Sequence, residues 1–143
     1  MSENKNNLNS KKLFVLQGPN FNLLKLQPFT NLTLDRLNKH IKIEAKKYNY
    51  NVFIFQTNHE GRAVSMLQKY RKKISGIILY PGPWSCSGYS ILDLFNIIKT
   101  PVIAISNKKQ ETIFTEIKYI YGEDLAHTTS EAFYVLNDKL SEE

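Results

Sequence analysis

Polar residues of the kinds that bind ligands gather in four short stretches of the sequence. Each stretch directly follows an apolar run, and they span residues 17–22, 56–61, 80–88 and 106–110. Backbone amides and short polar side chains are free of strand pairing at such places and often contact ligands. In the first stretch, Gly18-Pro19-Asn20 is also typical of a tight turn, in which Asn20 and Asn22 would only satisfy backbone groups. Both interpretations of Asn20 stay open.

Two other candidates are the pair His59-Glu60 and the single cysteine, Cys86. His59-Glu60 opens a predicted helix, where Glu60 would suit the positive end of the helix dipole, so a structural use is favoured. Cys86 precedes another predicted helix, a position that favours a thiolate. With His59 as its base and Glu60 or Asn58 as orienting group, Cys86 would be a nucleophile. The favoured alternative is a half-buried, inert cysteine.

Metal and cofactor sites are not expected from the sequence. His40, His59 and His127 share no ligand spacing, and one cysteine cannot make a zinc site. The phosphate-binding motifs GxxxxGK[ST] and GxGxxG do not occur. We therefore predict no metal and no cofactor.

Apolar runs and amphipathic segments alternate along the chain. Patterning predicts strands at 13–16, 52–55, 76–79, 101–105 and, more weakly, 117–121. It predicts helices at 33–49, 62–73, 89–98 and 110–116, and a last helix opened by a capping box at 128–131 and ending near 140. Residues 25–32 and 81–88 are predicted loops, and Thr33 or Asn31 is the expected cap of the first helix.

This alternation predicts an α/β fold, with a five-stranded parallel sheet and helices on both faces. In such a three-layer sandwich the carboxyl ends of the strands share one edge, and ligands bind there. All four polar stretches fall at that edge. We therefore expect any binding site to be built from them.

Composition limits the classes of function. The 143 residues are 42% hydrophobic and suggest one domain, preceded by a polar tail over residues 1–11 that we expect to be disordered. No signal peptide or run of 18 apolar residues occurs, and cysteine is nearly absent, so we expect no membrane contact and a cytoplasmic or other reducing compartment. The net charge of +6 comes mostly from lysines scattered among glutamates, which makes a nucleic-acid partner the less favoured reading.

Four motifs in chain order resemble those of the type II 3-dehydroquinate dehydratases. LQGPNFNLL at 16–24 is similar to the NGPNLNLL signature of this family, and FQTNHEG at 55–61 is similar to its Ser/Thr-Asn-His-Glu-Gly turn. GIILYPGPWSCSG at 76–88 and PVIAISN at 101–107 stand where the family has two further strand ends. The resemblance covers residues 12–140. It implies a single flavodoxin-like domain over 12–143, dehydration of 3-dehydroquinate through an enolate, and assembly into a trimer or dodecamer.

The same resemblance implies that most catalytic groups are replaced. Asn20 matches the asparagine that positions the enolate-stabilising water. The lid arginine aligns with Gln27, and no tyrosine occurs between residues 17 and 43 to serve as the base. Tyr80 stands in place of an asparagine and Cys86 in place of the proton-donating histidine.

Substrate-binding groups of the family are replaced as well. Ala104 and Ser106 occupy the positions of its Glu-x-His pair, or a deletion removes that pair, depending on the alignment. No arginine follows Arg71, so the later substrate-binding arginine is absent in any alignment.

Three hypotheses follow. The first is a protein without dehydratase activity, retained as an oligomeric scaffold or binding module. Its partners would be itself and a small anionic ligand or another protein, and its candidate binding residues are Asn20, Asn58, His59, Ser106 and Asn107. The second is an active dehydratase with Tyr80 or Cys86 as proton carrier and lysines such as Lys25 or Lys108 in place of arginine. The third is a different enzyme that uses Cys86.

Overall fold

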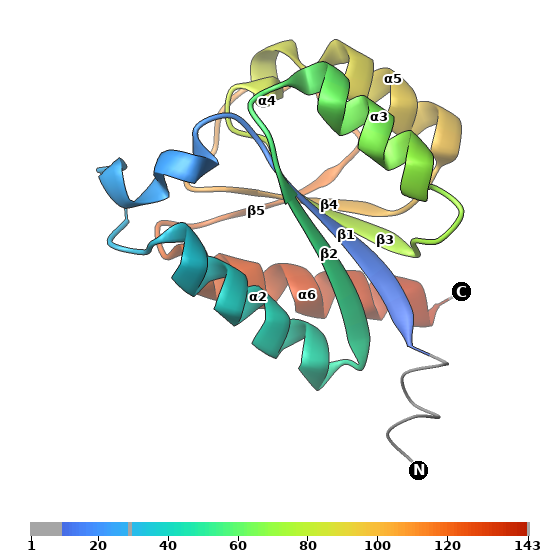
Figure 1. Cartoon of the computed structure of the whole chain (residues 1–143), viewed down its shortest axis with the longest axis horizontal. Coiled ribbons are helices and arrows are strands. Elements are labelled where there is room, and N and C mark those ends of the chain that lie inside the picture. Colours follow the sequence, from blue (N-terminus) through green and yellow to red (C-terminus); the bar gives the residue numbers. More distant parts are fainter. Residues whose placement is uncertain (1–9, 29, 143) are drawn as a thin grey trace.

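Five parallel strands form one sheet in the computed structural model, which describes residues 10–28 and 30–142 (Figure 1). The strand order is β2-β1-β3-β4-β5, that of a flavodoxin-like fold, and confirms the predicted architecture. The bounds are Lys11–Gln17 for β1, Tyr50–Gln56 for β2, Gly76–Tyr80 for β3, Val102–Ser106 for β4 and Lys118–Tyr121 for β5. Most of the predicted tail lies outside the described residues, but Lys11 already belongs to β1 and is in register with Tyr50.

Helices cover both faces of the sheet. Figure 1 shows α2 (Leu34–Lys47) and α6 (Leu125–Ser141) on one face, and α3 (Glu60–Tyr70) and α5 (Tyr89–Ile98) on the other. Alternate residues of β1 serve the two cores: Leu13 and Val15 pack toward α2 and α6, whereas Phe14 and Leu16 pack toward α3 and α5. Strands buried on both faces explain the continuous apolar runs of the sequence. No helix within the described residues has the length and apolarity to cross a bilayer.

The last helix begins earlier than predicted, because a different side chain caps it. The last helix begins at Leu125, where the carboxylate of Asp124 accepts a hydrogen bond from the N–H of His127. Thr128, predicted to cap this helix, lies inside it, and its hydroxyl donates to the carbonyl of Leu125 at 3.0 Å. Thr33 does cap α2, by accepting from the N–H of Arg36.

Two predicted connections also differ from the structure. The loop at 25–32 begins within a 3₁₀ helix, η1 (Phe21–Leu26), and the loop at 81–88 contains the four-residue helix α4 (Trp84–Ser87). The predicted helix at 110–116 does not form. Its β-branched residues are poor helix formers, and the N–H of Ile113 instead donates to the carbonyl of Ser85 at 2.8 Å.

The turn after β1 lies against the end of β3. The N–H of Gly18 donates to the carbonyl of Tyr80 at 2.9 Å. A Cβ atom at Gly18 would lie 2.6 Å from the carbonyl oxygen of Pro81 and 3.0 Å from the ring of Trp84. Only glycine allows this approach, so the turn and the end of β3 are held together by backbone contact.

A buried polar cluster joins the two helices on one face. Ser130 on α6 donates to Oε1 of Glu44 on α2 at 2.8 Å, and Lys47 donates to the same oxygen at 3.0 Å. His40 donates from Nε2 to the carbonyl of Ala126 at 2.9 Å, since a carbonyl can only accept. Burial raises the pKa of Glu44, but the hydrogen bonds from Lys47 and Ser130 and the nearby positive charges outweigh burial and lower the pKa.

Replacing Glu44 tests this cluster. Because folding lowers the pKa of Glu44 from its ordinary value of 4.5, the ionised carboxylate stabilises the fold at any pH above that value. This stabilisation is lost as the pH falls below the ordinary pKa and through the lowered one. We expect Glu44→Gln to lower the free energy of unfolding by about 1–2 kcal/mol at neutral pH, with the deficit shrinking in acid. Urea denaturation across pH measures this. The exposed Glu131→Gln on α6 is the control, and a deficit independent of pH would contradict the assignment.

Adding a methyl group at Gly18 tests the turn. Because the nearest atoms are backbone, Gly18→Ala should lower the free energy of unfolding by about 1–3 kcal/mol. At Gly61 in α3, an added Cβ would have no atom within 4 Å, so Gly61→Ala should be neutral or stabilise by up to about 1 kcal/mol. Chemical denaturation of both variants compares them directly. Equal stabilities would show that the turn can accommodate a methyl group after all.

Candidate ligand-binding site at the carboxyl edge of the sheet

The first two sequence motifs meet at the carboxyl edge. Asn20 adopts the left-handed conformation with φ of 74°, which asparagine tolerates better than most residues. Its N–H donates to Oδ1 of Asn58 at 3.0 Å. Gln56 donates from Nε2 both to Oδ1 of Asn58 at 3.2 Å and to the carbonyl of Gly18 at 3.1 Å. Asn58 therefore holds the backbone of Asn20 in place and leaves the Asn20 side chain without a hydrogen bond to any described residue.

A cavity of about 240 Å³, hereafter the site cavity, lies beside this turn at the ends of β1, β3 and β4. Its polar lining consists of four carboxamides and one hydroxyl, namely Asn20, Gln27, Asn107, Gln110 and Ser106. The rest of its described lining is Pro19, Phe21, Leu24, Gly82, Pro83, Ile105 and Leu125. None of these described residues carries an ionisable side chain. The lining can exchange hydrogen bonds with a ligand but offers no group that transfers protons near neutral pH.

Three of the predicted site residues come together in the site cavity: Asn20, Ser106 and Asn107. His59 does not line it. This residue precedes α3 and lines a separate open hollow of about 750 Å³ with Phe55 and Arg62. Cys86 is exposed in α4, and neither its thiol nor the His59 ring has a hydrogen bond to a described residue. No contact therefore supports a Cys86–His59 pair.

Tyr80 is buried and faces away from solvent. Its hydroxyl shares a 2.7 Å hydrogen bond with Thr129 of α6, and its ring lies 5.0 Å from that of Phe21. Burial raises the pKa of Tyr80 far above its ordinary value. A fully buried phenol that resists ionisation cannot exchange a proton with a ligand in the site cavity, so the structure does not support the hypothesis that Tyr80 is a proton carrier. The lysines proposed to replace arginine, Lys25 and Lys108, do not line the cavity either.

The lining residues that were not predicted as ligand contacts include Gln27, Gln110 and Leu125. Gln27 could have been found, because it aligns with the lid arginine of the resembled family. Gln110 closes the last polar stretch of the sequence. Leu125 gave no signal, since it reaches the cavity only because α6 begins there.

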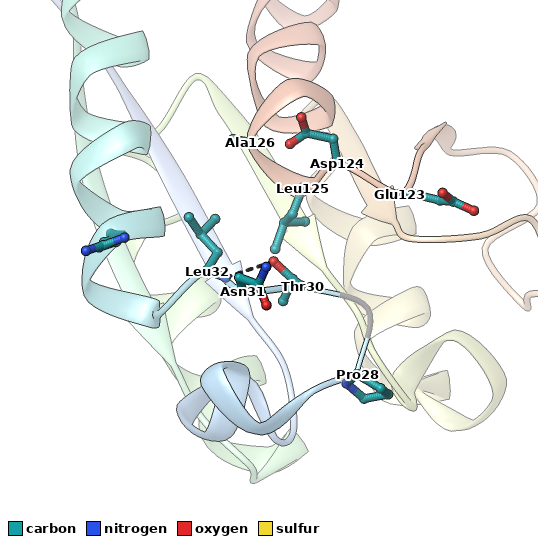
Figure 2. Close-up of a pocket in the computed structure, with 9 residues that line it drawn as sticks. Pro28, Thr30, Asn31, Leu32, Glu123, Asp124, Leu125 and Ala126 are labelled. Atoms are coloured by element: carbon teal, nitrogen blue, oxygen red, sulfur yellow. Dashed lines mark hydrogen bonds between the residues drawn. The ribbon is translucent and has the colours of Figure 1, made fainter.

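A second cavity, of about 410 Å³, lies between the starts of α2 and α6 (Figure 2). Its lining includes Arg36, Glu123 and Asp124, and Leu125 contributes to both cavities. None of the predicted site residues lies there, and the Asp124 carboxylate is already engaged in capping α6. Among the residues with described positions, no three His, Cys, Asp or Glu side chains form a cluster that could hold a metal. The site cavity is therefore the better candidate.

Sequence comparison identifies relatives of this chain. The family model described as Dehydroquinase class II matches residues 11–128. The 3-dehydroquinate dehydratase of Endomicrobium trichonymphae is 36% identical over 118 residues, which cover 79% of this chain and 82% of that protein. The 3-dehydroquinate dehydratase of Clostridium botulinum (strain Okra / Type B1) is 33% identical over 96 residues, and the match spans 65% of each chain.

Solved structures share the fold. The type II dehydroquinase from Butyrivibrio crossotus superposes with a TM-score of 0.78 at 22% identity, covering 92% of this chain and 98% of that one. A 3-dehydroquinate dehydratase-like protein from Bifidobacterium longum superposes with a TM-score of 0.71 at 18% identity, covering 93% of this chain and 99% of that one. Three observations support one family. The family model spans most of the sequence, the strand order is that of a flavodoxin-like fold, and the turn after β1 brings the first two motifs into contact. The chain belongs to the Dehydroquinase class II family.

Proposed function

We propose that this protein is a class II dehydroquinase-like binding module that holds a small molecule in the site cavity and has little or no dehydratase activity. The observation that carries this proposal is the lining of the cavity. Its described polar side chains are carboxamides and a hydroxyl, with no acid or base among them.

Loss of water from a hydroxyketone needs one group to remove a proton from carbon and another to protonate the departing hydroxyl. Each positioned group contributes roughly 10²–10⁴ in rate. Carboxamides can orient the substrate or a water molecule, as Asn20 would, but do not supply either proton transfer. Tyr80 is buried, and Cys86 and His59 lie outside the lining.

An active dehydratase is the second candidate. It is favoured by the names of the relatives at 36% and 33% identity and by the presence of Asn20 in the site cavity. This candidate requires a proton carrier that enters the cavity when substrate binds, and Cys86 or His59 would have to supply it. A third candidate, a different enzyme that uses Cys86, has no supporting contact among the described residues.

Turnover separates the first two candidates. With 3-dehydroquinate as substrate, we expect kcat/KM to fall at least about 10⁴-fold below that of the Endomicrobium trichonymphae relative, because both proton-transfer groups are missing. The conjugated product is followed by ultraviolet absorbance, with the relative as a positive control. Turnover within about 100-fold of the relative that Asn20→Ala abolishes would overturn the proposal in favour of the active dehydratase.

We also propose that the protein associates with copies of itself through β2. This strand ends the sheet, and no described residue pairs with its outer edge. Its sequence, YNVFIFQ, has seven residues without a charge or a proline. Monomeric proteins usually protect such an edge, whereas the other end strand, β5, is short and begins with Lys118. Two copies of β2 paired antiparallel about a twofold axis would satisfy both edges.

A proline at Ile54 tests this association. Thr57 donates its N–H to Gln17 of β1, and alternate residues of a strand direct their backbone to opposite edges. The N–H of Ile54 therefore faces outward, so Ile54→Pro removes an outward donor and leaves the pairing with β1 intact.

Light scattering after gel filtration gives the mass. We expect the wild type and Ile54→Val, which keeps the N–H, to exceed the 16.6 kDa of one chain, and Ile54→Pro to shift toward that mass. A monomeric wild type, or a proline variant that assembles like the valine variant, would rule out pairing through β2.

A further inference from the structure

We propose that the edge of the sheet opposite the site cavity binds a nucleic-acid duplex through its phosphate backbone. The parallel strands begin at this edge, and α2, α3, α5 and α6 end there (Figure 1). The inference is independent of the proposed function, because the residues that line the site cavity lie at the other edge. It rests on where the fold places the lysines and on what surrounds them.

The fold gathers basic residues that are scattered in the sequence. That scatter made a nucleic-acid partner the less favoured one. In the part of the chain that the structure describes, eleven lysines and arginines lie at the strand starts and helix ends, with four acids among them. These bases, hereafter the basic edge, occupy segments 11–12, 46–47 and 69–73 and the single positions Lys99, Lys118 and Lys139. Their surplus exceeds the net charge of the whole chain, +6, so the rest of the molecule is close to neutral.

Few of these charges are neutralised within the molecule. The four acids are Glu44, Glu116, Asp138 and Glu142. Glu44 is buried and pairs with Lys47, whereas no other base of the basic edge forms an ion pair with a described residue. Like charges gathered on one surface repel one another, and this repulsion destabilises the compact state unless an anionic partner offsets it.

Stabilisation of helix ends explains only part of the pattern. A cation in the last turn of a helix interacts favourably with the helix dipole, which accounts for Lys69, Lys139 and the pair at 46–47. Lys12 and Lys118 lie at the starts of strands instead, and sheets have only small dipoles. The accumulation of charge is therefore greater than the helices require.

Two hollows at the flanks of the basic edge can receive phosphate groups. One, of about 580 Å³, has Lys99, Lys139 and Thr100 in its lining. The other, of about 360 Å³, lies by the start of β2 and is lined in part by Lys42 and Lys46. Five strands spaced by about 4.8 Å make an edge about 20 Å wide, along which a duplex carries roughly twelve phosphate charges. Contact with the half that faces the protein gives about five phosphate contacts.

The chemistry of the basic edge suits the backbone of a duplex rather than bases. Tyr70 packs its ring on Phe53 at 4.6 Å, and the ammonium groups of Lys12 and Lys69 lie over it. The ring is therefore not free to stack on an unpaired base, as single-strand binding requires. All the bases except Arg71 are lysines, which bind phosphate as point charges and lack the fork that reads guanine. We expect binding without sequence preference.

Other anionic partners fit this surface less well. Lysine is depleted at protein–protein interfaces, which argues against an acidic protein. A protein that lies on a membrane buries an apolar face beside its charges. Ile43 and Ile97 are exposed near the basic edge, but they lie on α2 and α5, which cover opposite faces of the sheet. One flat membrane cannot take up both side chains.

Fluorescence anisotropy of a labelled DNA duplex of about 20 base pairs tests the proposal. At about 50 mM NaCl we expect the wild type to bind with a Kd of about 10 µM or below, and a duplex of unrelated sequence to bind within about threefold. The logarithm of the association constant should fall with the logarithm of salt with a slope of about −4 to −5. Absence of saturable binding, or a slope shallower than about −2, would overturn the proposal.

A fourfold lysine-to-glutamine variant tests the location. The substituted residues are exposed and spread over the basic edge: Lys46, Lys72, Lys73 and Lys139. The matched control removes the same charge from exposed lysines elsewhere: Lys25, Lys39, Lys108 and Lys109. We expect the first variant to lose at least about 30-fold in affinity at about 50 mM NaCl and to have a shallower slope, and the control to lose less than about fivefold. Equal losses would contradict the location.

Two further measurements complete the test. Urea unfolding checks both variants, and if the fourfold variant does not fold, Lys72→Gln/Lys73→Gln in the turn after α3 should still lose about three- to tenfold. An affinity that this double variant leaves unchanged would contradict the proposal. Sedimentation with vesicles of phosphatidylcholine and phosphatidylserine tests a membrane, and binding to vesicles without binding to the duplex would overturn the nucleic-acid assignment.

Discussion

The close approach of the turn after β1 to the end of β3 is the constraint on which the candidate site depends. Gly18 leaves no space for a side chain against Pro81, and its N–H bonds to the carbonyl of Tyr80. This contact brings Asn20 to the carboxyl edge of the sheet, where Asn58 holds its left-handed backbone. Because the hydrogen bond of this contact joins two backbone groups, it does not depend on the side chains that line the site cavity. The site can therefore keep its shape while its chemistry changes.

The chemistry at this edge is that of hydrogen bonding without ionisable groups. The described lining offers four carboxamides and a serine, without the acids, bases and cations that the resemblance leads one to expect around a dehydratase substrate. Carboxamides retain the capacity to exchange hydrogen bonds with a ligand, but they do not transfer protons. Membership of the family and the proposed lack of activity are thus compatible, since the family is recognised by the fold and its turns, whereas activity depends on a few side chains.

Tyr80 illustrates how a position at a strand end can join the core. Its ring packs on Phe21, and its hydroxyl pairs with Thr129, so burial leaves no polar atom of the phenol unsatisfied. Burial also ties the turn, β3 and α6 into one packed unit. A residue whose position in the sequence suggests a reactive group therefore acts as a structural link between the site and the helix behind it.

The sequence by itself determined the layers of the fold and the edge at which a site would lie. Apolar periodicity is a local property, so the strands at 13–16, 52–55 and 76–79 and the Thr33 cap could be predicted directly. Only the tertiary structure decided that Asn20, Ser106 and Asn107 face one cavity while His59 and Cys86 do not.

The errors have the same origin. Ile113 bonds to the distant Ser85 in place of a helical partner, and Asp124 rather than Thr128 caps α6. Local propensity cannot anticipate such partners, because they depend on which distant backbone groups packing brings within reach. For the same reason, the contribution of Leu125 to the cavity could not be predicted from its neighbours in sequence. The sequence determined which groups are available at the carboxyl edge, and long-range packing decided which of them a ligand can reach.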